Sequence, residues 1–395
     1  MKDIVSGPRT RSKETENRKA ALVAQERKAK RDEKILEKRR QDALRKRPKP
    51  VPGGRGDGSL HIAFIKVGQG DCAVMSTPLG RVIMFDCGSK PKEEDDSNDQ
   101  LIDRVRAAVV DNPKFLKGLD VLDILILTHA DADHYNKLKA VLQQDFTINR
   151  CYHSDELRAY SANGTSAFLR DNIAGPSAIK KVVKNHDETT LNGVTVAAPD
   201  FGNKVDRLGD DGGIVIVDER NCKVTILAAG VNREHNSDHS DEKNRGSIVT
   251  LIEANGEKLL LCGDATKSTE HFLMSTASDR LRGRLSNLTL VQAGHHGSNN
   301  TSSSQDFVNL VNPKIVVASA GKHIKKDHLP SEEVIERYRK KLTLSSRTKI
   351  PTHETFCWKP GGLKSRNHGS VWHEYEVFVT GSEDTIERTF PAPRA

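Results

Sequence analysis

Short runs of apolar residues, separated by polar or glycine-containing segments, recur along the chain from about residue 60 onward. The first runs predict a meander of three strands joined by two tight turns, with strands at 61–67, 72–75 and 81–85 and turns at 68–71 and 78–80. Four consecutive apolar residues at 124–127 predict a short buried strand. Apolar residues at helical spacing predict helices over 100–110 and just after His134. Strands and helices in alternation indicate α/β architecture.

The second half of the chain continues this alternation. Apolar runs predict strands at 222–228, 248–252, 258–261, 288–292 and 314–318. Helical spacing predicts helices over 269–285 and 331–341, and Asn255-Gly256 predicts the turn of a hairpin. Residues 150–222 form an elaboration, with a helix expected near 178–185 and strands at 194–198 and 214–217. The end of the chain predicts closing strands at 356–358 and 372–380.

The charge is unevenly distributed along the chain. Residues 1–50 contain 18 Lys and Arg against 8 Asp and Glu, a net charge of +10, so the rest carries −2 of the total of +8. We therefore expect a basic, helical or partly disordered arm over 1–47, a Pro/Gly linker over 48–58 and a folded domain over 59–395. The arm either binds nucleic acid or a protein partner or is a solvated tail. Its candidate nucleic-acid contacts are Arg39, Arg40, Arg45, Lys46 and Arg47.

Composition places the chain among proteins that do not cross membranes. No stretch approaches the roughly 20 consecutive apolar residues that a membrane-spanning helix needs. The charged N-terminus has no apolar segment behind it, so no secretory signal is expected. The six cysteines show no paired spacing, which favours a reducing, cytoplasmic location.

Candidate metal ligands follow the ends of three predicted strands. His129, Asp131, Asp133 and His134 lie within six residues after the strand at 124–127, separated only by alanines. The alternative is a polar loop that caps a helix, with Asp133 as N-cap, but two histidines and two aspartates at this density are more typical of a metal site. Asp264, and then His295 or His296, end two later strands. Together these residues could hold two divalent ions with one carboxylate bridging them, which is the chemistry of hydrolysis.

Six ordered motifs carry a resemblance to a known family. They are residues 128–134 (THADADH), 67–71 (VGQGD), 85–88 (FDCG), 261–264 (LCGD), 294–298 (GHHGS) and 328–330 (HLP). This set resembles the metallo-β-lactamase superfamily, and with Asp131 where a second histidine is common it resembles the hydrolase domain of ComEC-type DNA-uptake proteins. The resemblance implies an αββα sandwich of two mixed sheets flanked by helices, two metal ions at one edge, and nuclease activity on DNA.

The resemblance also implies roles for individual residues. His129 and Asp131 would bind the first ion. The second ion would be bound by Asp133, His134 and one of the tandem histidines, with His295 preferred over His296. Asp264 would bridge the two ions. His328 would contact the substrate or the developing oxyanion, or donate a proton, which makes Asp133, Asp264 and His328 the catalytic candidates. Asp71 and Asp86 would support the ligands. For the missing third ligand of the first ion, His235 and His239 lie in the right loop and Asn244 is the ComEC-like candidate. With Asp131 in place of an imidazole, the first site would be oxygen-rich and would either bind its ion more weakly or admit Mn²⁺ as readily as Zn²⁺.

Three functional hypotheses are compatible with the sequence. The first is a two-metal phosphodiesterase, most simply a nuclease acting on DNA or RNA, whose arm holds the polyanion. The second is a metallohydrolase of a small phosphodiester, ester or lactam, whose arm docks a partner, as in a defence or toxin effector. The third is a binding or assembly protein that uses a hydrolase fold as its scaffold, against which the intact set of ligands argues.

Overall fold

The computed structural model describes most of the chain beyond the predicted linker. The described residues are 55–90, 97–144, 146–174, 179–181, 188–191, 194–197, 213–231, 238, 240–276, 279–321, 328–345, 349–360, 368–382 and 384–393. The predicted arm over 1–47, with Arg39, Arg40, Arg45, Lys46 and Arg47, lies outside them. So do residues 48–54 of the predicted linker, and His235 and His239. No helix within the described ranges is long and apolar enough to cross a membrane.

The first sheet has seven strands and contains the predicted meander. Its order is β18 (Ile386–Phe390), β1 (Leu60–Phe64), β2 (Ala73–Ser76), β3 (Val82–Phe85), β4 (Val121–Leu127), β5 (Thr147–His153) and β6 (Ile179–Lys181). Neighbours from β18 to β3 pair antiparallel, and β3 to β6 pair parallel. The carboxyl ends of β3 and β4 therefore lie at the same edge of the sheet.

The second sheet also has seven strands and is mixed in the same way. Its order is β17 (Val377–Val379), β14 (Ile315–Ala318), β13 (Leu290–Gln292), β12 (Glu257–Leu261), β11 (Val249–Ala254), β10 (Cys222–Ala228) and β9 (Ile214–Glu219). Strands β9 to β12 pair antiparallel, whereas β12, β13, β14 and β17 pair parallel. The described residues also contain two small antiparallel sheets. In one, β7 (Glu188–Leu191) pairs with β8 (Val194–Ala197), and in the other, β15 (His353–Trp358) pairs with β16 (His368–His373).

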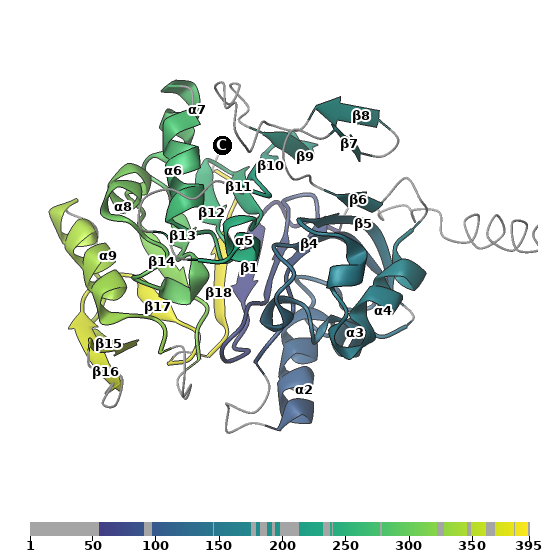
Figure 1. The fold of residues 1–395 in the computed structure, drawn as a ribbon, viewed down its shortest axis with the longest axis horizontal. Helices are drawn as coiled ribbons and strands as arrows, with labels where there is room; N and C mark the ends of the chain where they lie inside the picture. Colours follow the sequence, from purple (N-terminus) through teal and green to yellow (C-terminus); the bar gives the residue numbers. More distant parts are fainter. Residues whose placement is uncertain are drawn as a thin grey trace, which may run out of the picture. The chain divides into compact units, whose positions relative to one another are not determined.

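The hydrophobic residues form three layers of core, which makes the unit an αββα sandwich. Alternation along β4 explains how one strand serves two layers: Ile124 and Ile126 face the other sheet, while Leu125 and Leu127 face the helices. Figure 1 shows the two groups of helices on opposite sides of the sheets. One side carries α2 (Asn98–Val109), α3 (Leu138–Leu142) and α4 (Thr165–Asn172); the other carries α6 (Lys267–Thr276), α7 (Asp279–Leu285), α8 (Gln305–Val311) and α9 (Glu332–Leu344). The predicted fold class is confirmed.

Several local predictions were wrong where tertiary pairing decided the conformation. Within the helix expected near 178–185, residues 179–181 form the strand β6, which pairs with the edge of β5, and the rest of that range lies outside the described residues. The helix expected over 269–285 is divided into α6 and α7, in a stretch rich in Ser and Thr, which are weak helix formers. The strand expected over 372–380 is interrupted between β16 and β17, which belong to different sheets. Strands β5 and β18 and helices α4 and α8 were not predicted.

Candidate metal centre

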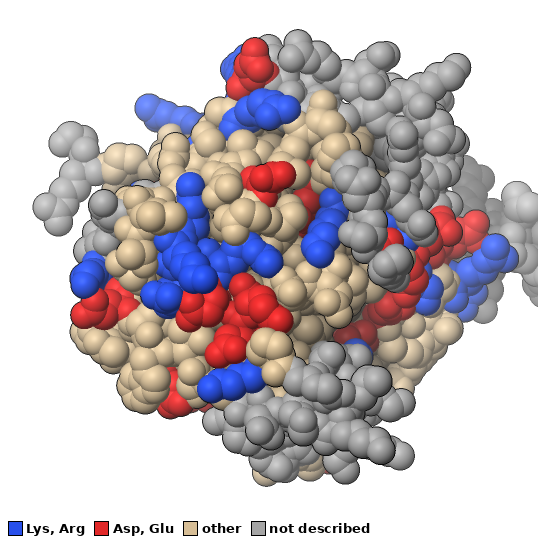
Figure 2. Space-filling model, turned by 60° about the vertical axis from the view of Figure 1, so that its left-hand side comes forward, with Lys and Arg blue, Asp and Glu red and all other residues tan. Residues whose placement is uncertain are grey.

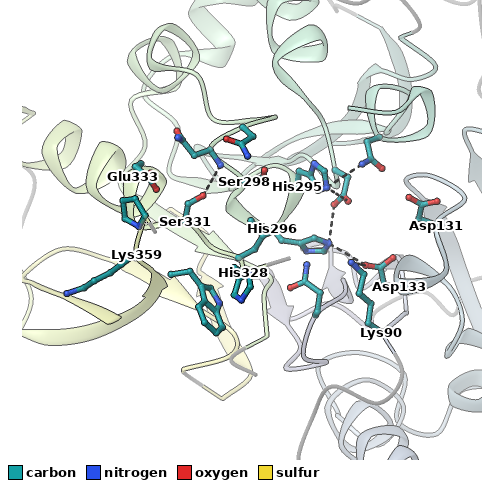
Figure 3. Close-up of a pocket in the computed structure, with 18 residues that line it drawn as sticks. Lys90, Asp131, Asp133, His295, His296, Ser298, His328, Ser331, Glu333 and Lys359 are labelled. Atoms are coloured by element: carbon teal, nitrogen blue, oxygen red, sulfur yellow. Dashed lines mark hydrogen bonds and ion pairs between the residues drawn. The ribbon is translucent and has the colours of Figure 1, made fainter. Parts of the chain in front are cut away.

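The predicted ligands converge at one end of the sandwich. His129, Asp131, Asp133 and His134 follow β4, the last two within the short 3₁₀ helix η1 (Ala132–His134). Asp264 follows β12 in the second sheet, and the tandem histidines that follow β13 begin η4 (His295–Gly297). Because β3 and β4 run parallel in one sheet, and β12 and β13 in the other, their carboxyl ends meet and gather these side chains. Figure 3 shows Asp131 and Asp133 facing the tandem histidines.

Asp264 lies among four imidazoles, two on each of its oxygens. Its Oδ1 is 3.2 Å from Nε2 of His134 and 3.5 Å from Nε2 of His296. Its Oδ2 is 3.7 Å from Nε2 of His129 and 3.6 Å from Nε2 of His295. The carboxylate therefore divides the site into two groups of ligands and is shared by both.

Each group contains one further carboxylate. Asp131 Oδ2 lies 3.6 Å from Nε2 of His129, which completes a first group of His129, Asp131, His295 and Asp264. Asp133 Oδ2 lies 3.7 Å from Nε2 of His296, which completes a second group of Asp133, His134, His296 and Asp264. The structure places His296, rather than the preferred His295, beside Asp133 and His134. The two groups consequently have the same composition, and the first is not richer in oxygen.

The histidines are oriented by hydrogen bonds on the ring nitrogen that faces away from the centre. Nδ1 of His134 donates to Asp86 at 2.8 Å, and Nδ1 of His296 donates to the carbonyl oxygen of Ser319 at 2.6 Å. Nδ1 of His295 is 2.7 Å from the Thr301 hydroxyl, and Nδ1 of His129 is 3.1 Å from the Thr128 hydroxyl. A donor proton on Nδ1 leaves the lone pair of Nε2 toward the centre, which is the arrangement that metal-binding histidines adopt.

Several atoms that face the centre are buried without a conventional partner. Nε2 of His129, His134 and His296 makes no hydrogen bond within the part of the chain that the structure describes. Leaving such atoms unpaired in the interior costs free energy, about 1–3 kcal/mol each, unless another group binds them. Two imidazoles and two carboxylate oxygens match the ligands that divalent ions take in proteins. The residues present therefore fit two divalent ions.

The carboxylates of the site are held in their ionised form. Burial alone would raise the pKa of Asp264, but His296, His134 and His295 hold it well below its usual range. Burial likewise opposes ionisation of Asp131, but its contacts with His129 and Lys243 lower its pKa to about 2. The pKa of Asp133 is also lowered, because His296 and His134 outweigh its burial. Ionised carboxylates at neutral pH are ready to bind cations.

The supporting residues stand directly behind the ligands. Asp86 accepts hydrogen bonds from the amide and hydroxyl of Thr128, at 2.8 and 2.6 Å, as well as from His134. Asp71 accepts a hydrogen bond from the side-chain amide of Gln292 at 2.6 Å, and burial raises its pKa to about 6. Asp86 and Asp71 thus lie where the sequence analysis expected supporting residues.

Asn244 lies beside the first group. Its side-chain amide is 3.3 Å from Nε2 of His295, and its Oδ1 is buried without a hydrogen-bond partner among the described residues. Amide oxygen and nitrogen are distinguished only by their surroundings, so an exchange of the two would turn the oxygen toward the first group. Asn244 can thus supply a further ligand or a hydrogen bond to one.

Two lysines at the site were missed by sequence reasoning. Nζ of Lys243 is 3.0 Å from Asp131 Oδ1, and Nζ of Lys90 is 3.7 Å from Asp133 Oδ2. Each brings a positive charge to the rim of a ligand group. No motif marks either residue: Lys90 lies in the loop after β3 and Lys243 in the short helix α5 (Glu242–Arg245), and the packing of distant segments places both. The partners of the histidines, Thr301 and Ser319, carried no sequence signal for the same reason.

His328 lines a cavity that opens beside the ligands. The cavity has a volume of about 440 Å³ and is lined by Asp131, Asp133, Asp264, His295 and His296 together with residues of α9 and the end of β15. The His328 ring lies edge to face against Trp358, with centroids 4.5 Å apart. His328 thus faces the same space as the ligands, in the position from which it could contact a substrate.

Comparisons with known proteins find one matching family and several similar proteins. The family described as the metallo-beta-lactamase superfamily matches residues 65–322. ComE operon protein 3 of Bacillus subtilis is 25% identical over 284 residues, 70% of this chain and 30% of that protein. Competence protein ComA of Neisseria gonorrhoeae is 36% identical over 125 residues, 32% of this chain and 17% of that protein. The chain therefore spans less than a third of either relative. Among solved structures, the metallo-beta-lactamase fold protein YhfI of Bacillus subtilis matches 84% of this chain and 100% of its own, at 10% identity and a TM-score of 0.40.

Proposed function

The chain belongs to the metallo-β-lactamase superfamily, and from that premise we propose that it is a two-metal phosphodiesterase, a nuclease acting on DNA or RNA. Proteins of this fold are mostly metal-dependent hydrolases and typically bind two divalent ions. The observation that supports the two-metal part of the proposal is Asp264, each of whose oxygens faces two imidazoles. A shared carboxylate of this kind keeps two ions close enough to act on one phosphoryl group.

The two groups of ligands would hold one ion each. Their mixture of imidazole and carboxylate suits Zn²⁺ and Mn²⁺. Bound ions would lower the pKa of an attacking water and neutralise charge on the phosphoryl oxygens. The chain itself contributes His328, which faces the cavity and can donate a proton to the leaving oxygen. Lys90, at the rim of the second group, adds positive charge where a phosphate would enter.

A nucleic-acid substrate is supported by the basic arm and by the resemblance of the motifs to ComEC-type DNA-uptake proteins, with which the similarity to competence protein ComA agrees. Residues 1–50 carry a net charge of +10. Figure 2, which brings the side of α8 and α9 forward, shows basic and acidic side chains in neighbouring clusters rather than one continuous basic surface. On this proposal the arm supplies the attraction for a polyanion that this face of the folded domain lacks.

The alternative function is hydrolysis of a small phosphodiester, ester or lactam, with the arm used to dock a protein partner. The cavity favours it, because about 440 Å³ falls within the range of small-molecule sites, roughly 300–1,000 Å³. The ligand groups would serve either substrate class equally well.

The first experiment combines metal analysis with hydrolysis assays. The intact chain is expected to contain two ions per molecule and to cleave single- or double-stranded DNA or RNA with Mn²⁺ or Zn²⁺. Asp133→Ala should abolish cleavage, whereas Asp171→Ala, which removes an exposed carboxylate on α4, should not. Cleavage that survives Asp133→Ala would contradict the two-metal proposal. Hydrolysis of small esters or lactams, but of no nucleic acid, would favour the alternative.

Deletion of residues 1–47 tests the role proposed for the arm. The truncated chain should hydrolyse a small diester as the intact chain does, but bind nucleic acid more weakly and with a shallower dependence on salt, because fewer counterions are released. The measurement is KM for an oligonucleotide over a range of salt concentrations. Equal KM values with and without the arm at every salt concentration would show that the arm does not hold the substrate.

A further inference from the structure

The cavity at the metal centre extends well beyond the ligands. Its metal end is lined by five members of the two ligand groups, Asp131, Asp133, Asp264, His295 and His296. Its other end is lined by Ser298, Asn299, Ser331, Glu333 and Lys359. We refer to these five residues as the distal pocket. Figure 3 shows the two ends on opposite sides of His328, with Asp131 and Asp133 at one side and Glu333 and Lys359 at the other.

The wall of the distal pocket is held by specific hydrogen bonds. The Ser331 hydroxyl donates to the carbonyl oxygen of Gly297 at 3.0 Å and accepts from the amide of Asn299 at 2.8 Å. The amide of Trp358 donates to the carbonyl oxygen of Pro330 at 2.8 Å, which fixes the end of β15 against the start of α9. The wall is therefore attached to the same loop that carries His295 and His296. A group bound there would have a defined position relative to the metal ions.

The two ends of the cavity differ in charge. The metal end has three carboxylates and Lys90 and would carry two divalent ions, so it suits the phosphate. In the distal pocket the charges of Glu333 and Lys359 are opposite, and Ser298, Asn299 and Ser331 are uncharged donors and acceptors. Without excess positive charge, this end does not favour a second phosphate. It suits an uncharged group that is rich in hydrogen-bonding atoms.

We propose that the distal pocket binds the nucleoside esterified to the scissile phosphate, one nucleotide unit at a time. The inference rests on the proposed phosphodiesterase function and narrows its substrate class. A nucleoside offers sugar hydroxyls and base edges to Glu333, Ser298 and Asn299, and the volume of about 440 Å³ is at the small end of the usual range. A nucleotide bound in such a pocket cannot remain paired and stacked in a duplex, so the substrate is single-stranded or has an unpaired nucleotide at the cleavage point.

The test compares Glu333→Ala with Glu332→Ala. Both glutamates lie in the first turn of α9, are half-buried and lie at the same helix N-terminus, but only Glu333 lines the cavity. The substrates are bis(p-nitrophenyl) phosphate, which has no nucleoside, and a dinucleotide. Loss of one hydrogen bond to a charged acceptor corresponds to a factor of about ten or more. Glu333→Ala should therefore raise the ratio of the dinucleotide KM to the bis(p-nitrophenyl) phosphate KM about tenfold, and Glu332→Ala should leave this ratio unchanged.

A second measurement uses the unmodified chain with one oligonucleotide, either single-stranded or annealed to its complement. We expect the single strand to be cleaved at least about tenfold faster, because unpairing costs a few kcal/mol. Equal rates on the two forms, or an unchanged KM ratio in Glu333→Ala, would overturn the distal pocket as a nucleoside site. Failure to hydrolyse any phosphodiester, bis(p-nitrophenyl) phosphate included, would instead contradict the proposed function itself.

Discussion

Asp86 accepts three hydrogen bonds immediately behind the metal centre, two from Thr128 and one from His134. Its backbone has a positive φ of 53°, a conformation in which Asn and Asp are tolerated better than most residues. The carboxylate therefore holds the end of β4 in place and fixes the proton of His134 on Nδ1. A side chain that never faces the substrate thus decides which nitrogen of a ligand is available.

Asp86→Asn tests this role. Asparagine keeps the backbone conformation, but its NH₂ group cannot accept the proton of His134, so the imidazole loses its orientation. We expect a 10- to 100-fold loss of metal affinity in the second group, the usual effect of removing such a partner. Titration of the metal-free protein with Mn²⁺ or Zn²⁺ measures it, with Asp171→Asn as the exposed control. An unchanged affinity would mean that His134 is oriented without Asp86.

Lys243 contacts the first group from a more exposed position. Its side chain is 50% exposed, and an ion pair in such a position is worth up to about 1 kcal/mol. Its ammonium competes with a metal ion for Asp131 and repels that ion, so Lys243→Met should tighten binding of the ion in the first group by up to about fivefold and leave the second unchanged, while Lys243→Arg should keep the affinity of the unmodified chain. Competition titrations that resolve the two ions measure both values. Equal tightening of both ions would show that Lys243 acts on the whole site rather than on Asp131.

At the scale of elements, the loops after β1 and β3 pack directly on η1. The amide of Asp71 donates to the carbonyl oxygen of Asp133 at 3.1 Å, and the amide of Cys87 donates to that of His134 at 2.7 Å. Gly88 completes this contact, because a side chain at that position would overlap the backbone of Asp133 and His134. The glycine in the motif at 85–88 is therefore required by the close approach of two backbones.

Gly88→Ala should destabilise the fold by about 1–3 kcal/mol, since backbone atoms cannot move aside cheaply. Gly283→Ala is the matched control. Gly283 lies inside α7 with no atom near the position of an added methyl group, so the same substitution should stabilise by about 0.5–1 kcal/mol. Urea denaturation of the metal-free protein measures both free energies of unfolding. If both substitutions changed the free energy of unfolding in the same direction, the result would contradict the packing described for η1.

At the scale of the whole molecule, the centre depends on the docking of two sheets. The amide of Ile248, before β11, donates to the carbonyl oxygen of Thr128, after β4, at 3.0 Å. The side chain of Gln292, at the end of β13, reaches Asp71 in the loop between β1 and β2 of the first sheet. Neither sheet holds a complete ligand group, because His129, Asp131, Asp133 and His134 follow β4 of the first sheet, and Asp264, His295 and His296 follow β12 and β13 of the second. Metal binding and folding are therefore coupled.

This coupling predicts opposite pH dependence for the metal-free and metal-loaded protein. Burial opposes protonation of His134 and His296, but Asp264 and neighbouring carboxylates outweigh it and raise the pKa of both. In the metal-free protein these charged pairs contribute stability that is fully present below the unfolded pKa, about 6.5, and is lost as pH rises through the raised values. Burial lowers the pKa of His295 and of His373, so these two residues affect the free energy of unfolding only below about pH 6.5.

Melting temperatures with EDTA should therefore fall as the pH rises above about 6.5. With metal present they should rise over the same interval, because binding displaces protons from the histidines. At a metal concentration 100 times Kd the expected gain is about 2.7 kcal/mol. Thermal unfolding followed by circular dichroism measures both curves. A metal-loaded protein that loses stability with rising pH as the metal-free one does would contradict the assignment of these histidines as ligands.

The sequence by itself determined the alternation of strands and helices and the types of residue at the strand ends, and the resemblance carried by its motifs implied the αββα sandwich. Apolar runs such as 124–127 identify strands because a buried strand needs them, and the ligands that follow directly in the chain must lie at the strand's end. His129, Asp131, Asp133, His134 and Asp264 could be identified in this way. The short strands and helices that depend on pairing with a distant edge, such as β6 and β18, could not.

Only the tertiary structure decided how the ligands are grouped. His295 and His296 are neighbours in the chain, yet their positive φ values of 45° and 54° accompany side chains that face different oxygens of Asp264. Lys243 reaches Asp131 from a position 112 residues away in the sequence. Spacing along a strand fixes which residues reach the edge of a sheet, but the assignment of each to one ion depends on the packing of two sheets and their loops.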